Sequence, residues 1–198
     1  GRAADVLGVY QKMGCDIIGL QETRRQCGVG LAVRKSISRS KVRSPEFISD
    51  RLLKVTLGLC NRARAVTFVV QYVGEKHTFW TALDRVVKEV PEHEKLFVLM
   101  DGNARTGRRE GGKLEREECK VFGAYGRDTL NDTRERLLSF SANHGLGLLN
   151  TFFSTTKNAT LYGFNGRGKQ GFDCILMRQR DRKLVRDDNV HPHPSFLP

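Results

Sequence analysis

Short apolar segments of strand length form the dominant pattern in this sequence, and they narrow the folds that it can adopt. The longest apolar run, residues 65–70, suits a buried strand, whereas a membrane-spanning helix needs about 20 such residues. We predict strands at residues 16–20, 29–33, 52–60, 64–73, 95–100, 146–151, 160–164, 172–177 and 183–191. Strands therefore outnumber helices, and several of them follow one another along the chain.

Three stretches have the apolar spacing of amphipathic helices. They cover residues 3–13, residues 79–90, which a proline ends, and residues 131–145, which start with an N-cap asparagine or aspartate and end at a glycine. Residues 102–128 contain six glycines and many charges, so we expect an exposed loop there. This order predicts a single α+β domain, residues 1–198, in which two sheets pack face to face with helices outside.

The net charge indicates which partners the protein can bind, and the cysteine pattern indicates its cellular compartment. The chain has 34 basic and 22 acidic residues, and its net charge of +12 attracts polyanions. Nucleic acid is the expected partner, and a basic surface that serves only solubility is the alternative. The cysteines are odd in number and never form a C-x-x-C pair, which argues against a disulfide framework or a structural zinc site. The cysteine pattern indicates a reducing compartment, so we expect a nuclear or cytoplasmic protein. No signal peptide is visible, and we expect no membrane partner and a monomeric state.

Carboxylates stand at the ends of several predicted strands. Glu22 follows the strand at residues 16–20, Asp101 ends the strand at residues 95–100, and Asp173 lies near the start of a third. Taken alone, each is more often a solvated cap or turn residue. Together at the rim of a sheet they could hold Mg²⁺, which prefers oxygen ligands. Phosphodiester hydrolysis needs such an ion to neutralise the charge that develops on the phosphoryl oxygens.

Three motifs follow one another in this chain: Gln-Glu-Thr at residues 21–23, Asp-Gly-Asn-Ala at 101–104 and Phe-Asp-Cys-Ile-Leu at 172–176. In this order they resemble the endonuclease/exonuclease/phosphatase superfamily. Further segments are similar to the endonuclease domains of non-LTR retrotransposons and to craniofacial development protein 2-like proteins: residues 79–83, 90–96, 136–140, 149–153 and 178–186. The resemblance spans nearly the whole chain. It implies a DNase I-like, four-layered α/β sandwich of two mostly antiparallel sheets flanked by helices.

The resemblance also implies roles for individual residues. Glu22 matches the metal-binding glutamate, so Mg²⁺, or Mn²⁺ in its place, is the expected cofactor. Asp101 matches the aspartate that orients or activates the attacking water, and Asn103 matches the asparagine that contacts the scissile phosphate. Tyr72 stands where the family has a tyrosine near the phosphate, and Asp173 matches the aspartate that pairs with the catalytic histidine.

The sequence departs from the family pattern in several places. It starts after the position of the family's first core strand, and the connection that follows Gln-Glu-Thr is short. Val73 and Gly74 follow Tyr72 directly, so the family's Tyr-x-Pro motif is not intact and a buried aromatic is the alternative reading of Tyr72. The family's Ser-Asp-His would begin where the sequence stops, so we expect impaired activity. His191 and His193 are poor substitutes, because flanking prolines hold that backbone extended.

Basic side chains are expected to contact the phosphates of DNA, with an ordinary solvated surface as the alternative. The candidates are Arg105, Lys169, Arg178, Arg180 and Arg182. The expected function is therefore Mg²⁺-dependent hydrolysis of DNA phosphodiester bonds. Two other functions stay open, an inactive nucleic-acid-binding remnant and a phosphoesterase that acts on a small molecule such as an inositol phosphate.

Overall fold

The computed structural model describes residues 8, 11–12, 14–21, 28–37, 41–43, 45–58, 65–72, 77–101, 118–125, 132–153, 161–162, 169–170 and 173–186. Its strands are β1 Ile17–Gln21, β2 Val29–Val33, β3 Glu46–Ser49, β4 Leu52–Gly58, β5 Ala65–Tyr72, β6 Lys95–Asp101, β7 Leu146–Leu148, β8 Leu161–Tyr162, β9 Lys169–Gln170 and β10 Asp173–Arg178. Its helices are α2 His77–Glu89, α3 Glu118–Val121 and α4 Asp132–Asn143, with 3₁₀ helices η2 Leu149–Thr151 and η3 Gln179–Leu184.

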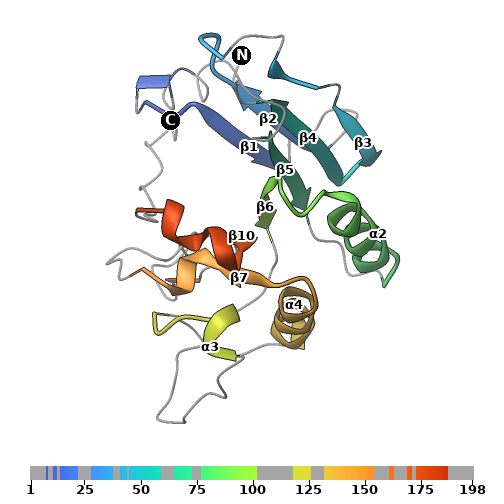
Figure 1. Ribbon diagram of the computed structural model, residues 1–198, viewed down its shortest axis with the longest axis vertical. Coiled ribbons are helices and arrows are strands. Elements are labelled where there is room, and N and C mark those ends of the chain that lie inside the picture. The colour runs from blue at the N-terminus through green and yellow to red at the C-terminus, as the bar shows by residue number, and fades with distance from the viewer. Residues whose placement is uncertain are drawn as a thin grey trace.

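Six of the described strands form the main sheet, in the order β3-β4-β5-β6-β10-β7 (Figure 1). Neighbouring strands in it run antiparallel, except for β5 and β6, which are parallel. Helix α2 joins this pair, because two parallel neighbours need a crossover rather than a tight hairpin. A second sheet contains β1 and β2, and β8 pairs with β9.

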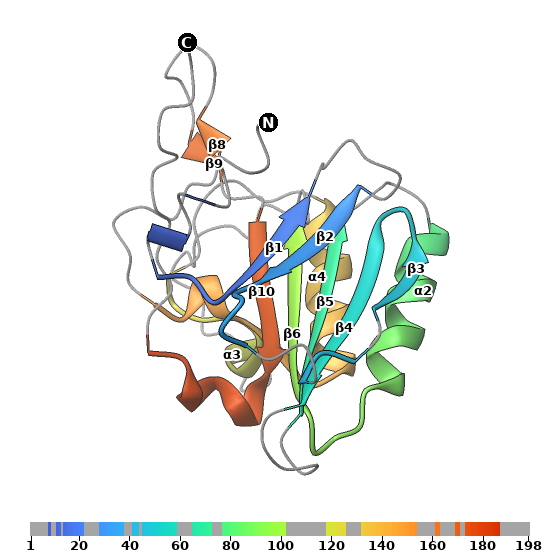
Figure 2. The same ribbon diagram turned by 90° about the horizontal axis from the view of Figure 1, so that it is seen from above.

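The main sheet lies between two other layers. Helices α2 and α4 cover one face and the β1-β2 sheet covers the other (Figure 2). The period-two alternation of β6 explains both contacts: Val98 packs toward the helices, whereas Leu99 packs toward the β1-β2 sheet. The core on the helix side includes the buried side chains of Leu83 and Leu137, one from each helix. The predicted α+β arrangement of two packed sheets with helices outside is confirmed.

Polar contacts join α2 to the end of α4. Helix α4 ends before Gly145, whose φ of +59° is the left-handed conformation that glycine adopts without steric cost. The preceding His144 places Nε2 2.9 Å from Oδ1 of Asp84 in α2, and Lys88 lies 2.8 Å from the other oxygen of that carboxylate. The hydrogen bond from Lys88, followed by that from His144, holds the pKa of Asp84 below its ordinary value.

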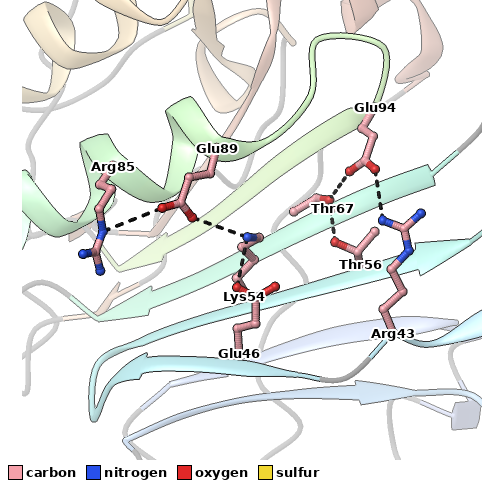
Figure 3. A network of polar contacts seen from close by, with 8 residues as sticks. All are labelled: Arg43, Glu46, Lys54, Thr56, Thr67, Arg85, Glu89 and Glu94. Atoms are coloured by element: carbon pink, nitrogen blue, oxygen red, sulfur yellow. Dashed lines mark hydrogen bonds and ion pairs between the residues drawn. The ribbon is translucent and has the colours of Figure 1, made fainter.

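A polar network with a buried carboxylate lies past the end of α2, at the start of β6 (Figure 3). The hydroxyl of Thr67 donates to Oε2 of Glu94 at 2.8 Å and lies 2.8 Å from the hydroxyl of Thr56. The other oxygen of Glu94 accepts from Arg43 at 3.3 Å. Because Glu94 is only 4% exposed, these bonds supply the partners that a buried carboxylate requires. The network therefore anchors β6, which starts directly after Glu94, to β4 and β5.

Two predictions from the sequence are wrong. Residues 183–191 were expected to form a strand, but Lys183 and Leu184 belong to η3, and residues 185–186 are not in a strand. The buried side chain here is Asp181, whereas Leu184 is 56% exposed, so the apolar alternation misled. Residues 102–128 were expected to be an exposed loop, but they contain α3 and the buried side chain of Phe122.

Further differences concern element boundaries. The predicted strand at residues 146–151 is the short strand β7 followed by η2, and β3 was not predicted at all. The predicted helix at residues 3–13 lies mostly outside the described residues, as do residues 187–191. Within the part of the chain that the structure describes, every helix is too short or too polar to span a bilayer.

Candidate active site

Three of the predicted site residues meet along one edge of the main sheet. Asp101 is the last residue of β6, and it pairs with Tyr72 of the parallel neighbour β5 and with Asp173 of the antiparallel neighbour β10. Strands β5 and β6 therefore end where β10 begins. Since neighbouring strands lie about 4.8 Å apart, the three backbones span about 10 Å of this edge. We call it the Asp101 edge.

The end of β1 lies over the same edge. The side-chain amide of Gln21, the last residue of β1, donates to the carbonyl of Gln71 in β5 at 2.9 Å and to that of Leu99 in β6 at 3.4 Å. The two strands also approach closely, because a Cβ on Gly19 would lie 2.6 Å from Cδ1 of Leu99. The absence of a side chain at Gly19 thus allows β1 to pack closely against β6. The hydrogen bonds of Gln21 hold the end of β1 in position over β5 and β6. Glu22, the next residue, lies outside the described part of the chain.

A second polar contact fixes the start of β10. Oδ1 of Asn150, in η2, accepts a hydrogen bond from the backbone N–H of Ile175 at 2.8 Å. Ile175 lies two residues after Asp173, so this bond holds the strand that carries Asp173. Sequence reasoning missed the positioning contacts of both Gln21 and Asn150. A signal was present, because each stands in a segment that resembles the family.

The residue types that the sequence predicts for the Asp101 edge are suited to a hard cation. Asp101 is half-buried and interacts with other residues of the protein. The residues predicted around it carry carboxylates, an amide and a phenol, so each can offer an oxygen atom to a metal ion. No thiol or imidazole is among them. That donor chemistry fits Mg²⁺. Among the described residues alone, no group of three or more His, Cys, Asp or Glu side chains converges.

Some predicted site residues cannot be placed in this geometry. Glu22, Asn103 and Arg105 lie outside the described residues, and so do the side chains of Tyr72, Asp173 and Lys169. The backbone positions of Tyr72, Asp173 and Lys169 are described, in β5, β10 and β9. The structure therefore brings positions 72, 101 and 173 together and leaves the roles of the six residues as predictions.

Arg178 lies at the other end of β10 from Asp173. Its Nη2 donates to the carbonyls of Val90 at 2.8 Å and Pro91 at 3.2 Å, directly after α2. A cation that binds the last carbonyls of a helix stabilises its C-terminus. Burial lowers the pKa of Arg178 below its ordinary value. Arg178 was expected to contact phosphate because it continues from the Asp173 strand. In the structure its guanidinium binds the carbonyls after α2, at the end of the main sheet opposite to Asp101.

Comparison with known proteins connects this geometry to a fold. Craniofacial development protein 2 from Bos taurus is 26% identical over 182 residues, which cover 87% of this chain and 29% of the relative's length. The endonuclease domain of TRAS1, a telomere-specific non-LTR retrotransposon, superimposes with a TM-score of 0.57 at 16% identity, over 87% of this chain and 72% of that domain. This is the DNase I-like fold.

A second solved structure with the DNase I-like fold agrees. The AP endonuclease LMAP from Leishmania major gives a TM-score of 0.55 at 10% identity, over 86% of this chain and 64% of that chain. No protein-family model matches the sequence. The DNase I-like fold and the similarity to craniofacial development protein 2, which the motifs predicted, are confirmed.

Proposed function

We propose that this chain is a Mg²⁺-dependent phosphodiesterase domain that hydrolyses the DNA backbone at the Asp101 edge. The register of the main sheet carries the proposal, because it brings Tyr72 and Asp173 to either side of Asp101. The hydrogen bonds of Gln21 hold the end of β1 beside these three positions. The nuclease names of the structural relatives and the net charge of +12 support nucleic acid as the substrate.

Each residue in the proposal has a chemical task. Glu22 would hold the Mg²⁺, which neutralises the charge that develops on the phosphoryl oxygens. Asp101 orients the attacking water and accepts its proton, for which a carboxylate on a rigid strand end is suited. Asn103 and Tyr72 donate hydrogen bonds to the scissile phosphate. The resemblance gives Asp173 the role of orienting a catalytic histidine through a hydrogen bond.

Nicking of supercoiled plasmid in Mg²⁺ tests this proposal. We expect nicking that EDTA abolishes and that Asp101→Asn lowers about 100-fold or more, the range for loss of a general base. The matched control is Asp16→Asn. Asp16 lies just before the start of β1, away from Gln21, and its carboxylate is 60% exposed and pairs with Arg34. Equal nicking by the wild-type protein and Asp101→Asn would refute the proposal.

The binding-only alternative has one observation in its favour, the net charge of +12. It predicts that the protein binds duplex DNA but does not nick plasmid in Mg²⁺ or Mn²⁺. A phosphoesterase for a small molecule predicts a different outcome, in which a soluble inositol phosphate competes for the site and DNA does not. The same purified protein distinguishes all three functions.

A further inference from the structure

A basic surface lies at the end of the sheet opposite to the Asp101 edge. Because β10 runs from Asp173 to Arg178, the 3₁₀ helix η3 that follows it starts across the sheet from Asp101. Arg180, Arg182 and Lys183 in η3, and Arg186 just after it, are all exposed. We call these four residues the η3 surface.

The one acidic residue of η3, Asp181, lies between two cations, since its Oδ2 is 3.8 Å from Nε of Arg180. Asp181 is only 4% exposed, and its carboxylate is bound by Lys95 at the start of β6. The structure thus turns the carboxylate inward and leaves the cations of η3 outside. Among the described residues, the exposed carboxylate of Glu92 lies 3.9 Å from the guanidinium of Arg180. At that distance and exposure an ion pair is weak, so the η3 surface keeps a net positive charge. Asp187 and Asp188, which follow Arg186 in the sequence, lie outside the described residues.

One cation of the η3 surface is held in position. The guanidinium of Arg182 lies over the ring of Phe152, 4.2 Å from its centroid. A stacked guanidinium loses less freedom when it binds an anion than a fully mobile side chain does, and its planar fork matches phosphate geometry. Arg178 is excluded from this surface, because its guanidinium already binds the carbonyls that follow α2.

We propose that the η3 surface binds the phosphate backbone of nucleic acid, as a contact separate from the Asp101 edge. The choice of nucleic acid over another polyanion rests on the function proposed above. The seven residues of β6 separate the two places, which at 3.3 Å per residue is about 20 Å. This distance corresponds to about six base pairs along a duplex. A phosphate bound at the η3 surface therefore raises the affinity for DNA and does not take part in hydrolysis at the Asp101 edge.

The salt dependence of DNA binding tests the η3 surface without requiring turnover. We would measure the anisotropy of a labelled 20-base-pair duplex against KCl for the wild-type protein and for Arg182→Gln/Lys183→Gln. Each lost phosphate contact lowers the slope of log K against log salt by about 0.9, so the double variant should lose about 1.8. Between 50 and 200 mM salt, its affinity should then fall about 12-fold less than that of the wild type.

Two further variants separate local contact from general charge. Arg85→Gln/Lys88→Gln removes the same charge from α2, where the side chains are 67% and 68% exposed, and should keep the wild-type slope. Arg182→Lys/Lys183→Arg keeps the charge at η3 and should also keep the slope. The proposal is overturned if the η3 and α2 double variants change the slope equally, or if neither changes it.

The remaining outcomes identify the partner. If Arg182→Gln/Lys183→Gln weakens binding to polyglutamate but not to the duplex, the η3 surface recognises an acidic protein and the proposal is wrong. Loss of slope in a protein that never nicks plasmid would refute the proposed enzyme and leave the η3 surface supported. An unchanged slope in a protein that nicks plasmid would do the reverse.

Discussion

The contact that joins β1 to the main sheet leads to a sharp prediction, the effect of Gln21→Met. Methionine has nearly the length and volume of glutamine, so the substitution removes the amide donor without opening a cavity. In the wild type this donor reaches the carbonyl of Gln71 at 2.9 Å and that of Leu99 at 3.4 Å. Both carbonyls belong to strands that end at the Asp101 edge.

The lost hydrogen bonds set the expected change in stability. A neutral hydrogen bond contributes about 1 kcal/mol net, and the longer bond contributes less because it lies near the distance limit. We therefore expect Gln21→Met to lower the free energy of unfolding by about 1–2 kcal/mol. For a chain of 198 residues that corresponds to a fall of roughly 2–8 °C in Tm. The end of β1 is then held less tightly over β6, and with it the position of Glu22.

Metal dependence separates this positioning role from simple loss of stability. Residues that orient metal ligands typically contribute 10- to 100-fold to metal affinity or activity, so the Mg²⁺ concentration for half-maximal nicking should rise about tenfold or more. The matched control is Gln179→Met, which removes a similar hydrogen bond to the carbonyl of Leu146, 3.1 Å long, at the opposite end of β10. It should cost about 1 kcal/mol and leave the Mg²⁺ dependence unchanged. The reasoning fails if the two variants respond to Mg²⁺ alike.

Two further predictions concern stability alone. Thr67→Val removes a hydrogen bond to the buried carboxylate of Glu94 and the contact with Thr56, so the free energy of unfolding, measured in urea, should fall by about 2–3 kcal/mol. As a control, Thr78→Val changes an exposed side chain of α2 and should alter that free energy by less than about 0.5 kcal/mol. Asp84 has a lowered pKa, so its stabilising contribution is present above its ordinary value of 3.8 and is lost as pH falls toward the lower folded value. The stability difference between wild type and Asp84→Asn should therefore shrink below pH 3.8, and a difference that grows as pH falls would contradict this sign.

The fold class and one part of the site could be predicted because they follow from local pattern. In β6 the buried residues Leu96, Val98 and Met100 alternate with positions that face the other sheet, and Asp101 interrupts the apolar run. Such a pattern marks a strand and its polar end without any knowledge of the neighbours. The positive φ of Gly145 likewise marks the end of a helix that the sequence places correctly.

The remaining features depend on which segments become neighbours. The amide of Gln21 has no local partner and acquires its role only when β1 lies across β5 and β6. Arg178 looks like a free surface cation in sequence, but its partners are carbonyls some ninety residues earlier in the chain. The turn at η3 depends on the burial of Asp181 against Lys95, which no periodicity signals. Sequence pattern reports local preference, whereas these contacts depend on tertiary packing.

The strand order β6-β10-β7 constrains how this protein is made. Residues 146–148 of β7 leave the ribosome before β10, yet β10 must enter between β7 and β6. Until it does, β6 and β7 each present an unpaired edge with free N–H and C=O groups, and such edges invite pairing with other chains. A folding intermediate in which β10 has not yet entered the sheet is therefore prone to aggregate, and in it Asp101 has a neighbour on one side only.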